Sequence, residues 1–281
     1  MPIGLTEILA PVPPPTFLTD HWPGKPLFVR GAPDKLRDLR ALPPLTDVSS
    51  MVATRTASVR TYLPDFNDES RSELIPPTMA LAAYRADRTL IFDALEDDCP
   101  SLAPILNRLA RELELPGTIG EISLTHARAI GYATPAGGRT GLHFDANANF
   151  VVQLQGRKRW SLATNRSVTN PTDRYAAGSG EIGVALDKQC HAPLIDELPD
   201  DTVEHVLQPG DVLFVPRGYW HETSTDEDSL SLTFAFTQPT WADLVLATLR
   251  DRLLQSPDWR ALARGNPPEF VKTWLERESN G

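Results

Sequence analysis

Apolar residues follow two different periods along the chain, and the period changes near residue 120. Before this point, an i, i+3, i+4 spacing predicts an amphipathic helix that ends at Pro116 and Gly117. Its apolar face consists of Leu102, Ile105, Leu106, Leu109 and Leu113. After this point, apolar and polar residues alternate or form short apolar runs, which is typical of strands. The sequence therefore predicts a mostly β protein with flanking helices.

Six predicted strands make up the central region, which we expect to close into a small barrel. They cover residues 121–134, 142–155, 158–163, 203–208, 211–215 and 229–237. A long polar insert, residues 164–198, separates the third strand from the fourth. Loops of this length in compact domains are usually functional lids or segments without structure. For this insert, a substrate lid and a solvated loop are both open interpretations.

The region before the barrel mixes both kinds of element. We predict strands over residues 26–31 and 55–63, a loop over 64–77, and a helix over 78–85. The expected organisation has three parts. Residues 1–120 pack on the barrel, residues 121–239 form its core, and residues 240–281 form a helical tail.

The tail begins at Thr240, which with Asp243 resembles a helix capping box. One face of the predicted helix is apolar and consists of Trp241, Leu244, Val245, Leu249 and Leu253. Such a stripe must be covered. Either it packs on the barrel, or it pairs with its copy in a homodimer. We favour the homodimer. A second short helix is predicted over residues 269–276.

Composition and charge narrow the classes of function. The chain has 281 residues, 41% hydrophobic and 23% charged, and a formal net charge of −10. An acidic surface disfavours binding to nucleic acid or to acidic membranes. No apolar run approaches the roughly 18 residues of a membrane span, and the N-terminus lacks the features of a signal peptide. Two cysteines give no disulfide framework, so we expect a cytoplasmic protein.

The candidate chemistry lies in an H-x-D pair, His143 and Asp145, and in a distant His221. In a strand, residues i and i+2 point to the same face, so the pair can share the barrel interior. We expect the run QPGDVLFVPRGYWH to form a turn and a short buried strand that delivers His221 just past its end. Two imidazoles and one carboxylate are a known ligand set for Fe(II) that leaves coordination positions open.

Other metal-binding interpretations are weaker. A structural zinc site usually closes with four ligands that include cysteine. Cys99 and Cys190 lie far apart and show no such spacing. The remaining candidates, His126, His191 and His205, have no partner at ligand spacing, and we expect structural or exposed roles for them.

These motifs resemble the JmjC and cupin-like Fe(II)- and 2-oxoglutarate-dependent oxygenases, nearest to the ribosomal oxygenase type. The resemblance covers residues 17–245 and is carried by FLTDHWPGKPLFVRG, PAGGRTGLHFD, NFVVQLQGRKRW, QPGDVLFVPRGYWHE and SLSLTFAFTQPTWADLV. It implies a double-stranded β-helix, or jelly-roll barrel. Only about forty residues follow the barrel, fewer than is usual in ribosomal oxygenases, which puts the ribosomal substrates of that type in doubt.

The resemblance also implies roles for individual residues. His143, Asp145 and His221 would hold Fe(II), and Lys158, fifteen residues after His143, would bind the far carboxylate of 2-oxoglutarate. The further residues that would line the cosubstrate site are Thr140, Asn149 and Tyr132, the last of which is displaced from the family position.

The implied activity is hydroxylation of an amino-acid side chain in a protein or peptide, with dioxygen and 2-oxoglutarate consumed. Two alternatives are open: the same chemistry on a small metabolite, and a non-oxidative metal-binding cupin. Lys158 and Thr140 argue against the latter, because a cupin without oxidative chemistry has no need of a 2-oxoglutarate anchor. The sequence does not separate protein from small-molecule substrates.

Overall fold

The computed structural model describes most of the chain, and the chain divides into two compact units. The described residues are 3–32, 34–62, 72–116, 118–119, 122–123, 126–179, 182–264, 268–269 and 271–273. One unit contains residues 1–115 and 125–238, and the other contains residues 116–124 and 239–281. The three-part organisation expected from the sequence stays a prediction.

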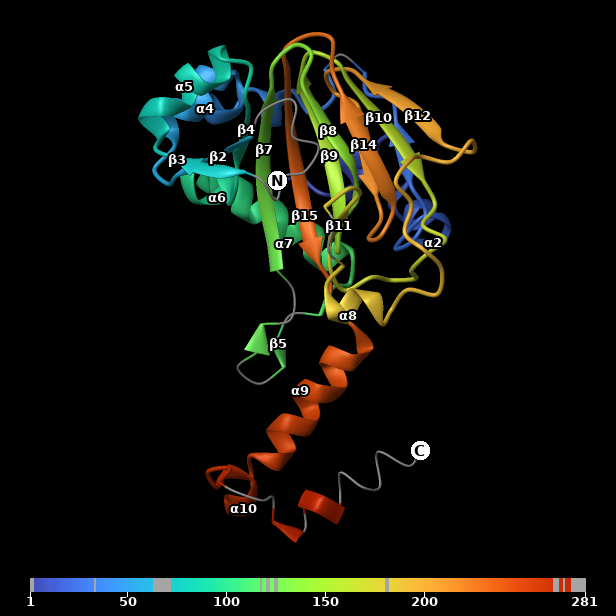
Figure 1. Ribbon diagram of the computed structural model, residues 1–281. Helices are drawn as coiled ribbons and strands as arrows, with labels where there is room; N and C mark the ends of the chain where they lie inside the picture. Colours follow the sequence, from blue (N-terminus) through green and yellow to red (C-terminus); the bar gives the residue numbers. More distant parts are fainter. Residues whose placement is uncertain are drawn as a thin grey trace. The chain divides into compact units, whose positions relative to one another are not determined.

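Two antiparallel sheets face each other in the larger unit (Figure 1). Among the described residues, the larger sheet has the order β1-β13-β9-β15-β7-β4-β2-β3 and the smaller one β11-β8-β14-β10-β12. The larger sheet consists of β1 (Leu27–Val29), β2 (Val59–Tyr62), β3 (Glu73–Ile75), β4 (Thr89–Phe92), β7 (His126–Thr134), β9 (Asn147–Gln155), β13 (Val212–Val215) and β15 (Ser229–Thr237). The smaller sheet consists of β8 (Arg139–Phe144), β10 (Lys158–Ala163), β11 (Tyr175–Ala176), β12 (Val203–Leu207) and β14 (Trp220–Ser224). This arrangement confirms the expected jelly-roll fold.

Strands from the N-terminal region extend the larger sheet on both sides. β1 pairs with β13, while β4 pairs with β7 and carries β2 and β3 beyond it. β3 and the first residue of helix α5 (Pro77–Arg85) lie within the segment that we expected to be a loop, so that prediction is wrong for residues 73–75 and 77. Residues 64–71 of that segment lie outside the described part. The barrel wall thus contains residues far from the site motifs in sequence.

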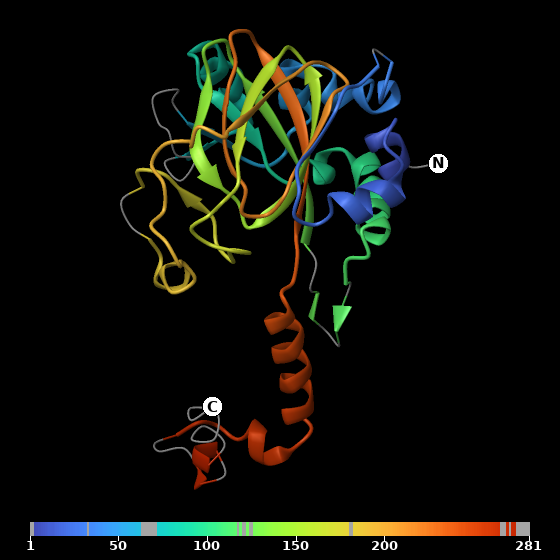
Figure 2. The same cartoon turned by 90° about the vertical axis from the view of Figure 1, so that its right-hand side faces the viewer.

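Helices cover the outer face of the larger sheet. They are α1 (Leu5–Leu9), α2 (Pro14–Asp20), α3 (Arg37–Arg40), α4 (Val48–Thr54), α5 (Pro77–Arg85), α6 (Leu95–Asp98) and α7 (Ala103–Glu112). Figure 2 shows the blue N-terminal helices beside the green α7 on one flank of the barrel. The apolar stripe of α7 is buried there, and Phe17 of α2 lies edge-on to Phe214 of β13 with ring centres 5.0 Å apart. The apolar residues at helical spacing in the sequence are therefore the face of α7 that is buried in this interface.

The insert between β10 and β12 forms the opposite flank, drawn in yellow in Figure 2. It contains β11 and the short helix α8 (Val184–Asp187). Its apolar residues Val168 and Leu186 are buried against Phe144 and Trp220 of the smaller sheet. These residues pack the insert on the smaller sheet. Whether the insert acts as a lid stays a prediction.

The second unit contains the short β5 (Thr118–Ile119) and β6 (Ile122–Ser123) and the helices α9 (Trp241–Leu253) and α10 (Pro257–Arg260). Thr240 and Asp243 form the predicted capping box at the start of α9. Residues 274–276 of the predicted final helix lie outside the described residues. Of the helices described, none has the length and apolar character needed to cross a membrane.

Two strand predictions near the site are wrong. The expected strand 142–155 is two strands, because β8 ends at Phe144 and β9 begins at Asn147. The break occurs at Asp145, whose backbone carbonyl accepts a hydrogen bond from Gly218 N (2.8 Å) rather than continuing the ladder. In addition, His221 does not follow the strand 212–215 directly. A turn at residues 216–219 leads into a separate strand, β14, that contains it.

Candidate metal centre

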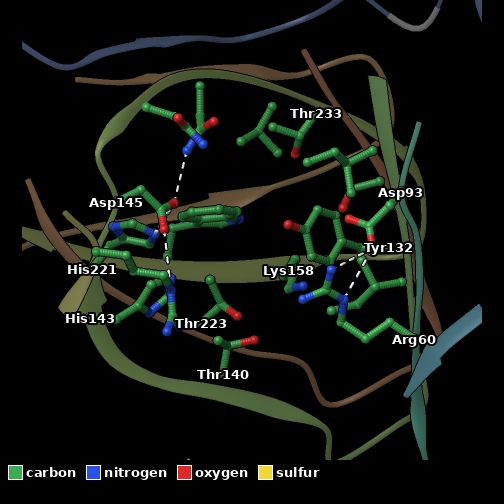
Figure 3. A pocket seen from close by; sticks show the side chains of 18 residues that line it. Arg60, Asp93, Tyr132, Thr140, His143, Asp145, Lys158, His221, Thr223 and Thr233 are labelled. Carbon is green, nitrogen blue, oxygen red and sulfur yellow. Dashed lines mark hydrogen bonds and ion pairs between the residues drawn. The ribbon is translucent and has the colours of Figure 1, made fainter. Parts of the chain in front are cut away.

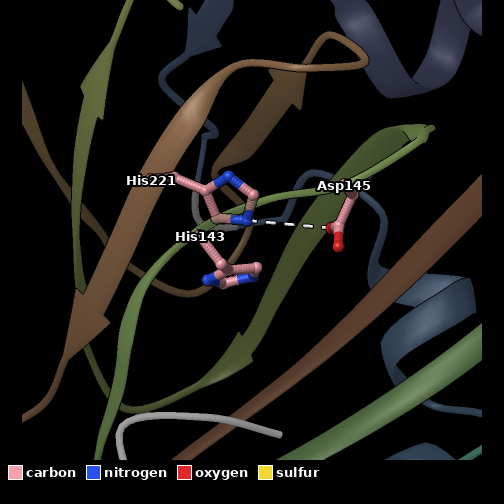
Figure 4. Close-up of side chains that lie close together, drawn as sticks. All are labelled: His143, Asp145 and His221. Carbon is pink, nitrogen blue, oxygen red and sulfur yellow. Dashed lines mark ion pairs between the residues drawn. The ribbon is translucent and has the colours of Figure 1, made fainter. Parts of the chain in front are cut away.

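Two neighbouring strands and one turn bring His143, Asp145 and His221 together (Figure 4). His143 on β8 lies directly opposite His221 on β14 in the antiparallel register, and the two ring centres are 4.1 Å apart. His221 Nε2 lies 3.8 Å from Asp145 Oδ2. One nitrogen or oxygen from each residue lies within 4.8 Å of the others. Within the described part of the chain, this is the one group of histidine, cysteine and carboxylate residues with such geometry.

Backbone carbonyls fix the orientation of both imidazoles. His143 Nδ1 lies 2.7 Å from the Gly141 carbonyl, and His221 Nδ1 lies 2.9 Å from the Tyr219 carbonyl. A carbonyl oxygen only accepts, so each Nδ1 carries a proton, and Nε2 is the nitrogen that each ring would offer to a metal. Burial, together with repulsion from His143, lowers the pKa of His221 to about 4. His221 is therefore neutral at neutral pH, as metal binding requires.

Asp145 provides the single negative charge of the group. Burial opposes its ionisation, but His143, His221 and Arg174 together hold its pKa below the usual value. Asn149 Nδ2 donates to Asp145 Oδ2 (3.0 Å), and Arg174 Nε lies 3.4 Å from Asp145 Oδ1. Two neutral imidazoles and an ionised carboxylate are the ligand set of the facial triad, so the residues present fit Fe(II).

A cavity of about 190 Å³ extends from this group between the two sheets (Figure 3). In that view the triad lies at one end and the ion pair of Arg60 and Asp93 at the other, with Lys158 between them. The cavity wall combines residues of the core barrel strands with Arg60 of β2 and Ile91 of β4, which belong to the N-terminal extension of the larger sheet.

Lys158, the first residue of β10, projects into this cavity and is only 3% exposed. Its Nζ donates to Thr134 Oγ1 (3.2 Å) and lies 5.6 Å from the centre of the Tyr132 ring. The preceding turn explains its position. Gly156 has φ +62° there, and a Cβ would collide with the Asp228 carbonyl, so glycine is required where the chain reverses from β9 to β10.

The other residues predicted for the cosubstrate site also line the cavity. Thr140 Oγ1 lies 2.8 Å from the Tyr62 hydroxyl. Tyr132 lies beside Lys158. It therefore lines the cavity although it is displaced from the family position in the sequence. Asn149 differs in that its amide is hydrogen-bonded to Asp145. That these residues bind a cosubstrate stays a prediction.

The three other histidines considered as candidate ligands lie elsewhere. His126 begins β7 and is exposed, His191 is exposed in the insert, and His205 stacks on Phe28 with ring centres 4.7 Å apart. Sequence reasoning missed Arg60, Tyr62 and Arg174. The alternation in the strand 55–63 places Arg60 and Tyr62 on one face, which was a usable signal, but no local motif marks Arg174.

Comparisons with known proteins agree with this geometry. The JmjC domain family matches residues 118–244. The chain is 33% identical over 266 residues to the uncharacterized protein YxbC of Bacillus subtilis (strain 168), covering 92% of this chain and 78% of that protein. It is 27% identical over 277 residues to ribosomal oxygenase 1 of Homo sapiens, covering 94% of this chain but only 39% of the human protein.

Solved structures show the same fold. The ribosomal oxygenase YcfD from Escherichia coli in complex with cobalt and 2-oxoglutarate superposes with a TM-score of 0.51 at 18% identity, covering 96% of this chain and 66% of that one. At this identity the likeness supports the fold alone. The chain therefore belongs to the JmjC-domain family of cupin-like, Fe(II)- and 2-oxoglutarate-dependent oxygenases and resembles its ribosomal oxygenase type.

Proposed function

We propose that this protein hydroxylates an amino-acid side chain of a protein or peptide, using Fe(II), 2-oxoglutarate and dioxygen. One observation carries the proposal: a two-histidine, one-carboxylate group and the buried Lys158 line the same cavity. A metal-binding cupin without oxidative chemistry does not need the buried lysine, whereas a dicarboxylate cosubstrate does. The likeness to ribosomal oxygenase 1 supports a protein or peptide substrate over a small metabolite.

Different residues bind the metal and the cosubstrate. His143, Asp145 and His221 would hold the metal, and a set of three protein ligands leaves coordination positions for other ligands. When bound, Fe(II) supplies oxidising chemistry that couples decarboxylation of 2-oxoglutarate to substrate hydroxylation. Lys158 pairs with the far carboxylate of the cosubstrate, and a charge-assisted contact in a buried cavity is strong and directional. Thr140 and Tyr132 complete that end of the cavity.

Exclusion of water is the second contribution of the chain. Lys158, Thr140, His143 and His221 are each less than 10% exposed. The mouth of the cavity, which we place at the Arg60–Asp93 ion pair, is more open. The side chains of these two residues are 40% and 32% exposed. A substrate side chain that enters the mouth therefore meets a reactive centre shielded from bulk solvent, which limits side reactions.

The test of the function is release of succinate from 2-oxoglutarate by the iron-loaded protein, with and without candidate substrates. A panel of peptides and a panel of free amino acids and related metabolites separates the two substrate classes. We expect peptides to stimulate succinate release and to gain 16 mass units. Stimulation by metabolites alone would contradict the peptide assignment, and absence of 2-oxoglutarate turnover in every condition would contradict the oxygenase assignment.

We also propose that the protein works in the cytoplasm and forms a homodimer through α9. Trp241, Val245 and Leu246 on this helix are 84%, 63% and 62% exposed, more than an apolar face tolerates in water. Light scattering at micromolar concentration should give twice the chain mass, and Trp241→Ser should lower it. A monomeric mass for the unmodified protein would rule out the dimer.

A further inference from the structure

The insert between β10 and β12 is a fixed part of the metal site. β11 pairs with β8 so that Tyr175 lies opposite Phe144 and Ala176 opposite His143. The next position in this register places Arg174 opposite Asp145. Hydrogen bonding from Ala177 N to the Leu142 carbonyl (2.8 Å) fixes the other end of the pairing.

Packing holds this pairing in place. Val168 and Leu186 are 1% and 2% exposed, and they form a cluster with Phe144 and Trp220, which flank the metal ligands in sequence. Pro171 lies against Gly218, where any side chain larger than hydrogen would collide with the proline ring. Gly218 N in turn donates to the Asp145 carbonyl (2.8 Å). The insert therefore contacts both strands that carry the triad and the turn between Val215 and Trp220.

The two oxygens of the Asp145 carboxylate have different neighbours. Oδ2 faces His221 Nε2 at 3.8 Å and accepts from Asn149 Nδ2 at 3.0 Å. Oδ1 points the other way, toward Arg174 Nε at 3.4 Å. The Arg174 side chain is 30% exposed and lines the cavity, so water screens this ion pair only partly. This ion pair with Oδ1 favours the orientation of the carboxylate in which Oδ2 faces His221.

We propose that Arg174 is a positioning residue for Asp145, supplied by the insert so that the carboxylate is preset for the metal. The inference rests on the proposed metal-binding role of the triad. On this proposal the insert is not a moving lid. Instead, the packing of the insert determines how tightly the metal is held. Residues that orient metal ligands from outside typically contribute 10- to 100-fold to metal affinity.

The experiment is a titration of the metal-free protein with Co(II), followed by the visible absorption of the bound ion. We expect the Kd for Co(II) to rise about 10- to 100-fold in Arg174→Gln and in Arg174→Met, which keeps most of the aliphatic stem. The absorption spectrum at saturation should also change, since the carboxylate is free to rotate. The thermal midpoint of the metal-free protein should stay close to that of the unmodified protein.

A matched control is Arg166→Gln. Arg166 belongs to the same insert but forms an exposed ion pair with Asp201, with side chains 70% and 55% exposed. We expect its Co(II) affinity to equal that of the unmodified protein. Unchanged or tighter Co(II) binding in either folded Arg174 variant would overturn the proposal. Failure of the unmodified protein to bind Co(II) would instead overturn the metal site itself, so the two failures are distinguishable.

Discussion

The cavity has a metal end at the triad and, between the triad and the mouth, a region around Lys158 that we call the lysine end; the two handle buried charge in opposite ways. At the metal end, the Asp145 carboxylate is surrounded by groups that donate or carry positive charge: the Asn149 amide, the Arg174 guanidinium and the two imidazoles. At the other end, the Lys158 ammonium, 3% exposed, lies beside the Thr134 hydroxyl and the face of the Tyr132 ring. A hydroxyl and an aromatic face stabilise a cation less than a carboxylate does.

The difference indicates what each end is built to receive. The metal end presents an anion and two neutral nitrogens and is matched to a divalent cation. The lysine end presents a buried ammonium group, which is matched to an anionic ligand. A dianionic cosubstrate that binds the metal with one end and Lys158 with the other satisfies both requirements. The cavity thus contains two sites of opposite charge, Asp145 among the triad and Lys158, in one lining.

Loss of a metal ligand should have the largest effect and should break the metal end alone. In His143→Ala and Asp145→Ala, we expect Co(II) and Fe(II) binding and 2-oxoglutarate turnover to be abolished, because two ligands cannot hold the ion against water. Circular dichroism should show a folded protein. His191→Ala, at an exposed histidine of the insert, is the control and should bind metal normally. Full Fe(II) affinity in His143→Ala would show that the triad is wrongly assigned.

Loss of Lys158 should break the opposite end. Removing one member of a buried charge pair costs about 3–5 kcal/mol, so Lys158→Ala should raise the KM for 2-oxoglutarate about a hundredfold or more. The Kd for Co(II) should change little. Arg159→Ala is a matched control, since Arg159 is the next residue of β10 but pairs with Glu204 outside the cavity. An unchanged dependence on 2-oxoglutarate in Lys158→Ala would remove the main reason for the oxygenase assignment.

The sequence predicted the elements of this cavity that local motifs encode. The H-x-D pair, the Gly156 turn with Lys158 after it, and His221 within its motif all lie where a short stretch of chain determines the geometry. The strand that contains His221 was missed because Trp220–Ser224 has no clear alternation of its own. It is a strand because β8 and β10 flank it on both sides.

The remaining parts of the site depend on pairing between distant segments. Arg60 reaches the cavity, and Tyr62 reaches Thr140 in its lining, only because β4 joins β2 to β7. Arg174 reaches it because β11 pairs with β8. No period or motif near these residues specifies a partner that lies 30 to 80 positions away. The H-x-D pair also shows the limit of periodicity. The i, i+2 argument assumed one strand, whereas β8 ends at Phe144 and a turn directs Asp145 to the same site.

Acid should affect the metal end through His221. Its pKa is lowered to about 4 in the folded protein, against 6.5 for the unperturbed group, so between these values the unfolded state binds more protons. The free energy of unfolding of the metal-free protein therefore falls as the pH decreases from about 6.5 to about 4. Above about pH 6.5 His221 is neutral in both states, so the protein keeps its full stability there. Urea denaturation at several pH values measures it. His221→Asn should flatten part of this slope, and identical slopes in both proteins would contradict the assignment.

The smallest expected effect concerns Tyr62. This residue tests how much the lysine end depends on the Tyr62–Thr140 contact, apart from Lys158 itself. The phenol lies 2.8 Å from Thr140 Oγ1 and is 1% exposed, so it holds the threonine hydroxyl in one rotamer beside the cavity. A neutral hydrogen bond contributes about 0.5–1.5 kcal/mol, so Tyr62→Phe should raise the KM for 2-oxoglutarate about two- to tenfold. The Kd for Co(II) should not change, since the phenol does not contact the triad.

Two further variants make this result interpretable. Tyr84→Phe removes a half-buried phenol that is hydrogen-bonded to Asp228, away from the cavity lining, and should leave the KM for 2-oxoglutarate unchanged. Thr140→Val should raise that KM at least as much as Tyr62→Phe, and the double variant should add little, because both changes remove the same contact. If instead Tyr62→Phe weakens Co(II) binding, the two ends of the cavity are coupled through β8. Their separation into independent charge sites would then be wrong.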